Sequence, residues 1–231
     1  MNKHTIVYLL RHGEAEGNIS RHFHGHYDSD LTSNGLLQAE LAAKRLASEP
    51  IEVIYSSDLM RAYKTAQEVA KIKNLEIQVE KNLREIHGGD WENIRWDDLP
   101  QKFPESYMNW EDAPHLLEIP GGETMREFQK RLISCMETIL EQNRGKSVLV
   151  TTHGTAIRTM MCYFKGLPLE QLNQIHWYDN TALSILQFDC NNTCEILLEG
   201  DNSHLGDLST LARQDWWKKE NGGFKKIKNE R

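Results

Sequence analysis

Short apolar runs alternate along the chain with longer segments whose apolar positions recur at helical spacing. Four runs rich in β-branched residues predict strands, over residues 5–10, 51–56, 76–80 and 147–152. The segments between and after them predict helices, over residues 33–49, 58–72, 124–145 and 155–165. Strands that alternate with helices pack as a mostly parallel sheet with helices on both faces. We therefore expect an α/β three-layer sandwich.

The helix expected over residues 124–145 has the clearest end signals. Thr124 and Glu127 have the spacing of a capping box, and Gly145 fits the stop. Its apolar face contains Met125, Phe128, Leu132, Ile133, Met136, Ile139 and Leu140. For the helix over residues 33–49, Thr32 is the expected N-cap. The apolar stripe predicted there contains Leu36, Leu37, Leu41 and Leu46.

Three regions depart from this alternation. Residues 87–122 contain tryptophans, prolines and glycines with little periodicity, and a stretch of that kind is expected to form a lid over the carboxyl-end edge of the sheet. Residues 182–189 and 193–199 flank a Cys-Asn-Asn turn and predict a β-hairpin. The polar, basic residues 218–231 are expected to form a flexible tail. Residues 1–231 would then form a single domain with a lid insertion and a tail.

Composition and charge narrow the class of protein. The chain has 231 residues and a net charge of −7, with no long basic run before the tail, so nucleic acid is not an expected partner. No apolar stretch approaches 18 residues, so no membrane association is expected. Four cysteines without a paired pattern are typical of a reduced, cytoplasmic protein. The sequence leaves the oligomeric state open, with a homodimer as one option.

Charged and titratable side chains follow each of the four strands predicted to be parallel. Arg11 and His12 follow the first strand, Arg61 the second, Glu85 the third and His153 the fourth. Ligands of open α/β sheets collect at the carboxyl ends of the strands, so these side chains should converge. Two guanidinium groups can neutralise a phosphate dianion, a neutral imidazole can act as a nucleophile, and a carboxyl group can move protons. Each residue alone is more often a satisfied or solvated side chain, so the prediction rests on their joint occurrence.

The segment RHFHGHYD raises a competing interpretation. His22, His24 and His26 alternate, so on a strand their imidazoles would share one face, as in a metal site. Gly25 and the polar neighbours favour a loop, and no carboxylate–histidine pattern accompanies the three histidines. We expect a loop that lines the phosphate pocket and no metal.

Several stretches resemble, in order, the motifs of the histidine phosphatase superfamily, which includes the cofactor-dependent phosphoglycerate mutases. They are LLRHGEAEGN, DSDLTSNG, YSSDLMRAYKTA, LREIHGGDWE, PGGET, VTTHGTAIR, DNTALSIL and NSHL. The resemblance implies that His12 is the nucleophile and forms a phosphohistidine, and that Glu85 is the general acid and then the general base. It also implies a phosphoryl-binding pocket and neither a metal nor a cofactor. The residues implied for that pocket are Arg11, Arg61, His153, Asn18 and the backbone of Gly154.

The chain departs from the family pattern at two places. Related sequences often carry glutamine or threonine and then glycine where this chain has His24 and Gly25, which implies that both lie near the substrate. Asn93 stands where many phosphatases of the family have glycine. Neither change affects the core set of catalytic residues.

The fate of the phosphoryl group separates a phosphatase from a mutase. A mutase needs additional cations for a second phosphate, whereas residues 87–122 contain Arg95 and Lys102 against eight acidic residues. We therefore predict a phosphatase that hydrolyses a small phosphorylated metabolite, with a phosphoglycerate mutase as the alternative. A third option is an inactive phosphate-binding scaffold, which the complete set of catalytic residues disfavours.

Overall fold

The computed structural model describes residues 4–213, 219–220 and 223–224. Its main sheet has the strand order β3-β2-β4-β1-β5-β6. The parallel strands are β1 (Thr5–Arg11), β2 (Val53–Ser56), β3 (Ile77–Val79) and β4 (Ser147–Thr152). The predicted hairpin is confirmed as the antiparallel strands β5 (Leu183–Phe188) and β6 (Cys194–Asp201). The predicted tail falls mostly outside the described residues, apart from a short ladder of β7 (Lys219–Glu220) with β8 (Gly223–Phe224).

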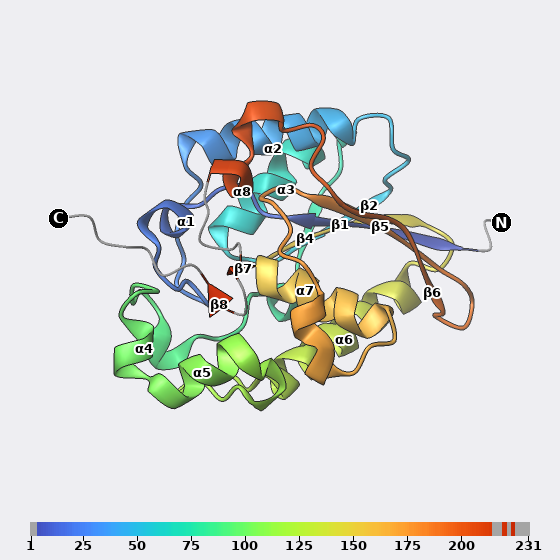
Figure 1. Cartoon of the computed structure of the whole chain (residues 1–231). Helices are drawn as coiled ribbons and strands as arrows, with labels where there is room; N and C mark the ends of the chain where they lie inside the picture. Colours follow the sequence, from blue (N-terminus) through green and yellow to red (C-terminus); the bar gives the residue numbers. More distant parts are fainter. Residues whose placement is uncertain (1–3, 214–218, 221–222, 225–231) are drawn as a thin grey trace.

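Helices cover both faces of the sheet, so the predicted three-layer sandwich is confirmed (Figure 1). One face carries α2 (Ser33–Arg45) and α3 (Met60–Lys73), and the other carries α6 (Met125–Gln142) and α7 (Gly154–Phe164). β1 feeds both layers because successive side chains on a strand point to opposite faces. Val7 and Leu9 belong to the core beneath α6 and α7, while Tyr8 and Leu10 belong to the core beneath α2 and α3.

The capping box of α6 forms as predicted. Thr124 accepts a hydrogen bond from the Glu127 amide, and the Glu127 carboxylate accepts one from the Thr124 amide. All seven apolar residues of the predicted face are buried.

The apolar stripe predicted for α2 is wrong at two of its four residues, although Thr32 caps the helix as expected. Leu46 is buried in the core at the C-cap and Leu41 is half-buried. Leu36 and Leu37 are 44% and 48% exposed, and the buried face is made of small residues and Gln38. Close packing explains why the buried face of α2 is made of small residues. A Cβ on Gly35 would lie 2.0 Å from the carbonyl oxygen of Glu14, so a larger residue cannot stand there.

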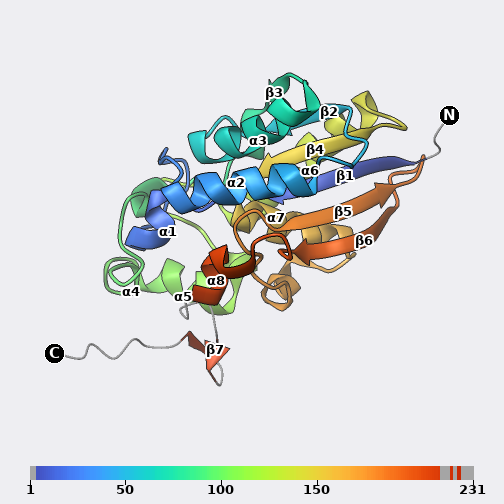
Figure 2. The same cartoon turned by 90° about the horizontal axis from the view of Figure 1, so that it is seen from above.

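Residues 87–122 are more regular than the sequence indicated. They contain α4 (Leu99–Lys102) and α5 (Pro104–Asp112), with 3₁₀ turns at Gly89–Trp91 and Pro114–Leu116. The two helices gather at the carboxyl end of the parallel strands, near α1 (Glu16–Ser20), where a lid was expected (Figure 2). Buried Trp91 and Trp110 tie this segment to the main core. Helices this short show too few turns for a clear periodic pattern, so the sequence analysis did not predict them.

The remaining short elements are α8 (Thr210–Arg213) and 3₁₀ turns at Lys81–Leu83, Leu169–Gln174 and Gly206–Leu208. In the described part of the chain, every helix is too short or too polar to cross a lipid bilayer.

Candidate active site

The carboxyl ends of β1 and β4 bring two histidines side by side. Arg11 pairs in register with Thr152, so His12 and His153 stand next to each other just beyond the two strands. Their ring centroids are 5.2 Å apart. The Nε2 atom of His153 is 2.9 Å from the hydroxyl of Ser57, which follows β2. Three neighbouring strand ends therefore meet at one point, as the sequence predicted.

The His12 ring is held in one orientation. Its Nδ1 atom lies 2.6 Å from the carbonyl oxygen of Gly13, so Nδ1 carries the proton and Nε2 keeps a free lone pair. Burial lowers the pKa of His12 well below 6.5, and the positive charges of Arg61 and Arg11 lower it further. A neutral imidazole with an unprotonated Nε2 can act as a nucleophile.

Two buried arginines flank this imidazole. Arg11 donates from Nη1 to the carbonyl oxygen of Tyr178, and Arg61 donates to the carbonyl oxygens of Gly25 and Tyr27. Neither Nε–H group has a hydrogen-bond partner among the residues that the structure describes. Burial lowers the pKa of Arg61 to about 10, which leaves it charged at neutral pH. Two buried cations with unused donors suit a bound dianion.

Glu85 is fixed by backbone contacts at the edge of the same cavity. Its carboxylate accepts hydrogen bonds at 2.9 Å from the amides of Ile86 and of Thr155, in the first turn of α7. Its carbonyl oxygen accepts one from Arg131 and contacts His26 Nε2. The carboxyl group is thus oriented without a direct partner among the catalytic side chains predicted from the sequence.

The residues assigned to substrate binding also lie here. His24 lines the cavity, and its ring packs so closely on Gly17 that a Cβ there would lie 1.4 Å from Nε2. Burial lowers the pKa of His24 to about 3. Asn18 and Gly25 line the same cavity, and Gly154 begins α7 beside the Arg11 guanidinium.

The histidines of the RHFHGHYD segment do not point at one centre. His26 contacts the Glu85 carbonyl oxygen, and its ring centroid lies 4.7 Å from that of His87, while His22 contacts Ser20. Among the described residues, no group of three or more histidine, cysteine or acidic side chains is arranged to hold a metal ion.

A cavity of about 770 Å³ extends from the two histidine-bearing strand ends to helices α4 and α5. Sequence reasoning missed much of its wall, namely Phe23, Tyr107, Trp177 and Arg21. Arg158 lies over the Trp177 ring, 4.2 Å from the centroid, and holds the indole against the cavity. The VTTHGTAIR stretch ends at Arg158 and the DNTALSIL stretch begins two residues after Trp177, but no pattern in them indicated that the Trp177 side chain would reach the cavity.

Comparisons with known proteins agree with this geometry. The family model of the histidine phosphatase superfamily (branch 1) matches residues 7–201. Phosphoserine phosphatase 1 of Hydrogenobacter thermophilus is 33% identical over 89% of this chain and 97% of its own, and phosphoglycerate mutase-like protein 4 of Arabidopsis thaliana is 32% identical over 89% of each. The solved structure of Bacillus stearothermophilus YhfR superposes with a TM-score of 0.83 at 36% identity, covering 87% of this chain and 98% of that one. The chain belongs to the histidine phosphatase superfamily.

Proposed function

We propose that this protein hydrolyses a small phosphomonoester through a phosphohistidine on His12. One observation carries the proposal: a buried, neutral imidazole lies close to two buried guanidinium groups whose Nε–H donors have no partner in the described part of the chain. A phosphoryl group supplies the oxygens that these donors lack, and the cations stabilise the charge that develops during transfer.

The reaction takes two steps on the same residues. In the first, His12 Nε2 forms a bond to phosphorus, the bond to the leaving oxygen breaks, and the Glu85 carboxyl group gives its proton to that oxygen. In the second, Glu85 takes a proton from water, the water oxygen bonds to phosphorus, and the phosphorus–nitrogen bond breaks. Arg11, Arg61 and His153 hold the phosphoryl oxygens throughout, with Asn18 and the Gly154 amide nearby.

The wall of the cavity supports an apolar or ring-bearing leaving group. Phe23 lies 5.1 Å from Trp96 and 5.8 Å from Trp110, and Trp110 lies 6.4 Å from Trp177, measured between ring centroids. His24 and Gly25 lie at the junction of this aromatic wall with the phosphate pocket. Aromatic faces pack well on planar groups.

The charges of the lid support hydrolysis over a mutase reaction. Arg21 lies 2.9 Å from Asp97, and Arg95 lies 3.6 Å from the same carboxylate. These are the arginines of the cavity wall beyond the phosphate pocket, and both are paired with an acid. A second phosphate would have to compete with Asp97 for them.

Phosphoserine is a second candidate substrate, because the Hydrogenobacter relative is named a phosphoserine phosphatase. The test is a panel assay in EDTA with phosphoserine, aryl phosphates, sugar phosphates, and 3-phosphoglycerate with 2,3-bisphosphoglycerate. We expect phosphate release from at least one monoester, undiminished by the chelator. Rapid isomerisation of phosphoglycerate with little phosphate release would favour the mutase instead, and loss of all turnover in EDTA would contradict the metal-free mechanism.

A further inference from the structure

Two buried carboxylates lie next to the catalytic residues but take no part in the reaction described above. Glu14 is 4% exposed and Asp179 is 2% exposed, and neither lines the cavity. A buried carboxylate is costly unless hydrogen bonds or cations compensate it. Both find much of that compensation in one short segment, residues 208–213.

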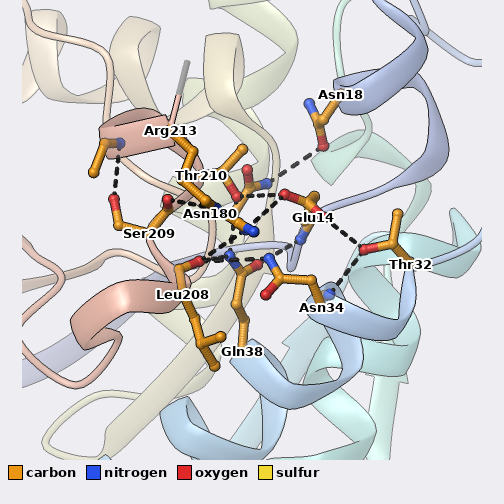
Figure 3. Close-up of polar contacts among 12 residues, drawn as sticks. Glu14, Asn18, Thr32, Asn34, Gln38, Asn180, Leu208, Ser209, Thr210 and Arg213 are labelled. Carbon is orange, nitrogen blue, oxygen red and sulfur yellow. Dashed lines mark hydrogen bonds and ion pairs between the residues drawn. The ribbon is translucent and has the colours of Figure 1, made fainter.

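Glu14 is part of a closed ring of hydrogen bonds (Figure 3). Its amide donates to Gln38 Oε1 at 2.8 Å, Gln38 Nε2 donates to Thr210 Oγ1 at 2.9 Å, and the Thr210 hydroxyl donates to Glu14 Oε2 at 3.0 Å. Arg213 adds an ion pair to the same oxygen at 3.2 Å, and Thr32 donates to the other. Each donor in the ring meets an acceptor, which fixes the direction of all three bonds.

Asp179 receives the start of helix α8. Its Oδ1 atom accepts hydrogen bonds at 3.1 Å from the amides of Thr210 and Leu211, and its Oδ2 atom accepts one from the Ser209 hydroxyl. The first amides of a helix have no carbonyl four residues earlier within it, and here Asp179 supplies the acceptor. Glu14 therefore binds the side chain of Thr210, and Asp179 binds its backbone amide.

Both carboxylates belong to segments that hold the catalytic groups. Glu14 is two residues after His12, and its carbonyl oxygen accepts the Thr32 amide. The neighbours of Asp179 act on the other side: the Tyr178 carbonyl oxygen accepts from Arg11, and Asn180 Nδ2 donates to the His12 carbonyl oxygen at 3.0 Å. A displacement of either carboxylate would therefore move the backbone that positions Arg11 and His12.

We propose that residues 208–213 form a positioning segment for the phosphoryl-transfer site, with Thr210 as its central residue. Thr210 joins the two carboxylates, since its hydroxyl bonds to Glu14 and its amide bonds to Asp179. The match to the family model ends at residue 201, so this segment lies outside it. The kinetic part of the proposal rests on the proposed function, because it concerns the geometry in which His12 meets phosphorus.

The test compares Thr210→Val with Thr210→Ser in the full chain. Valine keeps the shape of the side chain and removes the hydroxyl, whereas serine keeps the hydroxyl. Thr5→Val is the matched control: it removes a buried hydroxyl that accepts a hydrogen bond from the Gly145 amide, at the opposite end of β1. The readouts are kcat and KM well below the unfolding temperature, and hydrogen exchange of the Glu14 amide.

We expect Thr210→Val to lower kcat about tenfold with KM changed less than threefold, because misplaced catalytic groups weaken transition-state contacts more than substrate binding. Exchange of the Glu14 amide should quicken at least tenfold, because Gln38 Nε2 loses one of its two acceptors and keeps only the Leu208 carbonyl oxygen. Thr210→Ser and Thr5→Val should stay within twofold of the unaltered protein in both readouts. Should Thr210→Val fail to fold, Ser209→Ala takes its place, with the same kinetic result expected and exchange read at the Leu211 amide.

Unchanged kcat, unchanged amide exchange, or an equal fall of kcat in Thr5→Val would each overturn the positioning role. If the unaltered protein hydrolyses no phosphomonoester, the proposed function fails. The exchange measurement still decides whether Thr210 orders the loop after His12.

Discussion

The rings of His12 and His153 lie 5.2 Å apart at the ends of two adjacent parallel strands, and both are buried. Burial holds the pKa of each well below 6.5, and the charge of Arg61 acts in the same direction. The two imidazoles are consequently neutral at physiological pH in the absence of a bound anion. One can attack phosphorus, and the other can hold a phosphoryl oxygen.

Replacement of the nucleophile gives the most direct test of the mechanism. We expect His12→Ala to abolish both turnover and the acid-labile phosphate that is trapped when the enzyme is quenched during hydrolysis. His4→Ala, just before the start of β1, should leave both unchanged. Acid-labile phosphate on the His12→Ala protein would assign the nucleophile to another residue.

Substitution of Glu85 should have an effect that depends on the leaving group. Glu85→Gln keeps the contacts of Oε1 but cannot supply a proton, so poor leaving groups should suffer a loss of about 10²–10⁴-fold in kcat/KM and good ones much less. A series of aryl phosphates with graded phenol pKa values measures this slope. Glu76→Gln, at an exposed position, serves as the control. An equal loss across the series would remove Glu85 from the acid role.

The buried histidines should make the folded state less stable in acid. The folded-state pKa of His24 is lowered to about 3, whereas in the unfolded chain a histidine titrates near 6.5. Below pH 6.5 the unfolded state binds a proton that the folded state does not, so this stabilisation is present above that pH and is lost as pH falls toward 3. Each such histidine contributes at most about 1.4 kcal/mol per pH unit.

Urea unfolding between pH 7 and 4 measures that slope. His24→Gln should show a shallower dependence on pH than the unaltered protein, because glutamine does not titrate. Parallel curves for the two proteins would contradict the assignment.

Shortening the aromatic wall should separate substrates by their leaving groups. Trp96 is half-buried and touches Phe23 and Trp110 from the cavity side, so Trp96→Ala removes contact area without emptying the core. We expect KM for 1-naphthyl phosphate to rise about tenfold, equivalent to ~1.4 kcal/mol. KM for phosphoserine should change less than threefold, because its small side chain gains little from the indole. Equal changes for the two substrates would argue against an aromatic subsite.

Local patterns along the chain were sufficient for the frame of this protein. The alternation in β1 settles which residues face each layer, and the capping box and apolar face of α6 define that helix without reference to its neighbours. The convergence of Arg11, Arg61, Glu85 and His153 also followed from sequence, because the ends of parallel strands must meet at one edge. These predictions succeed because each depends on residues close together in sequence or on the rule that the ends of parallel strands meet at one edge of the sheet.

Tertiary packing decided the rest. The buried face of α2 is small rather than leucine-rich because Gly35 must approach the Glu14 backbone closely. Helices α4 and α5 form where Trp91 and Trp110 bury against the main core, which no short periodic pattern reveals. No pattern in the sequence distinguishes Glu14 from an ordinary loop carboxylate. Only the folded chain brings Thr210 to it across 196 residues, and contacts that distant leave no periodic signal in the sequence.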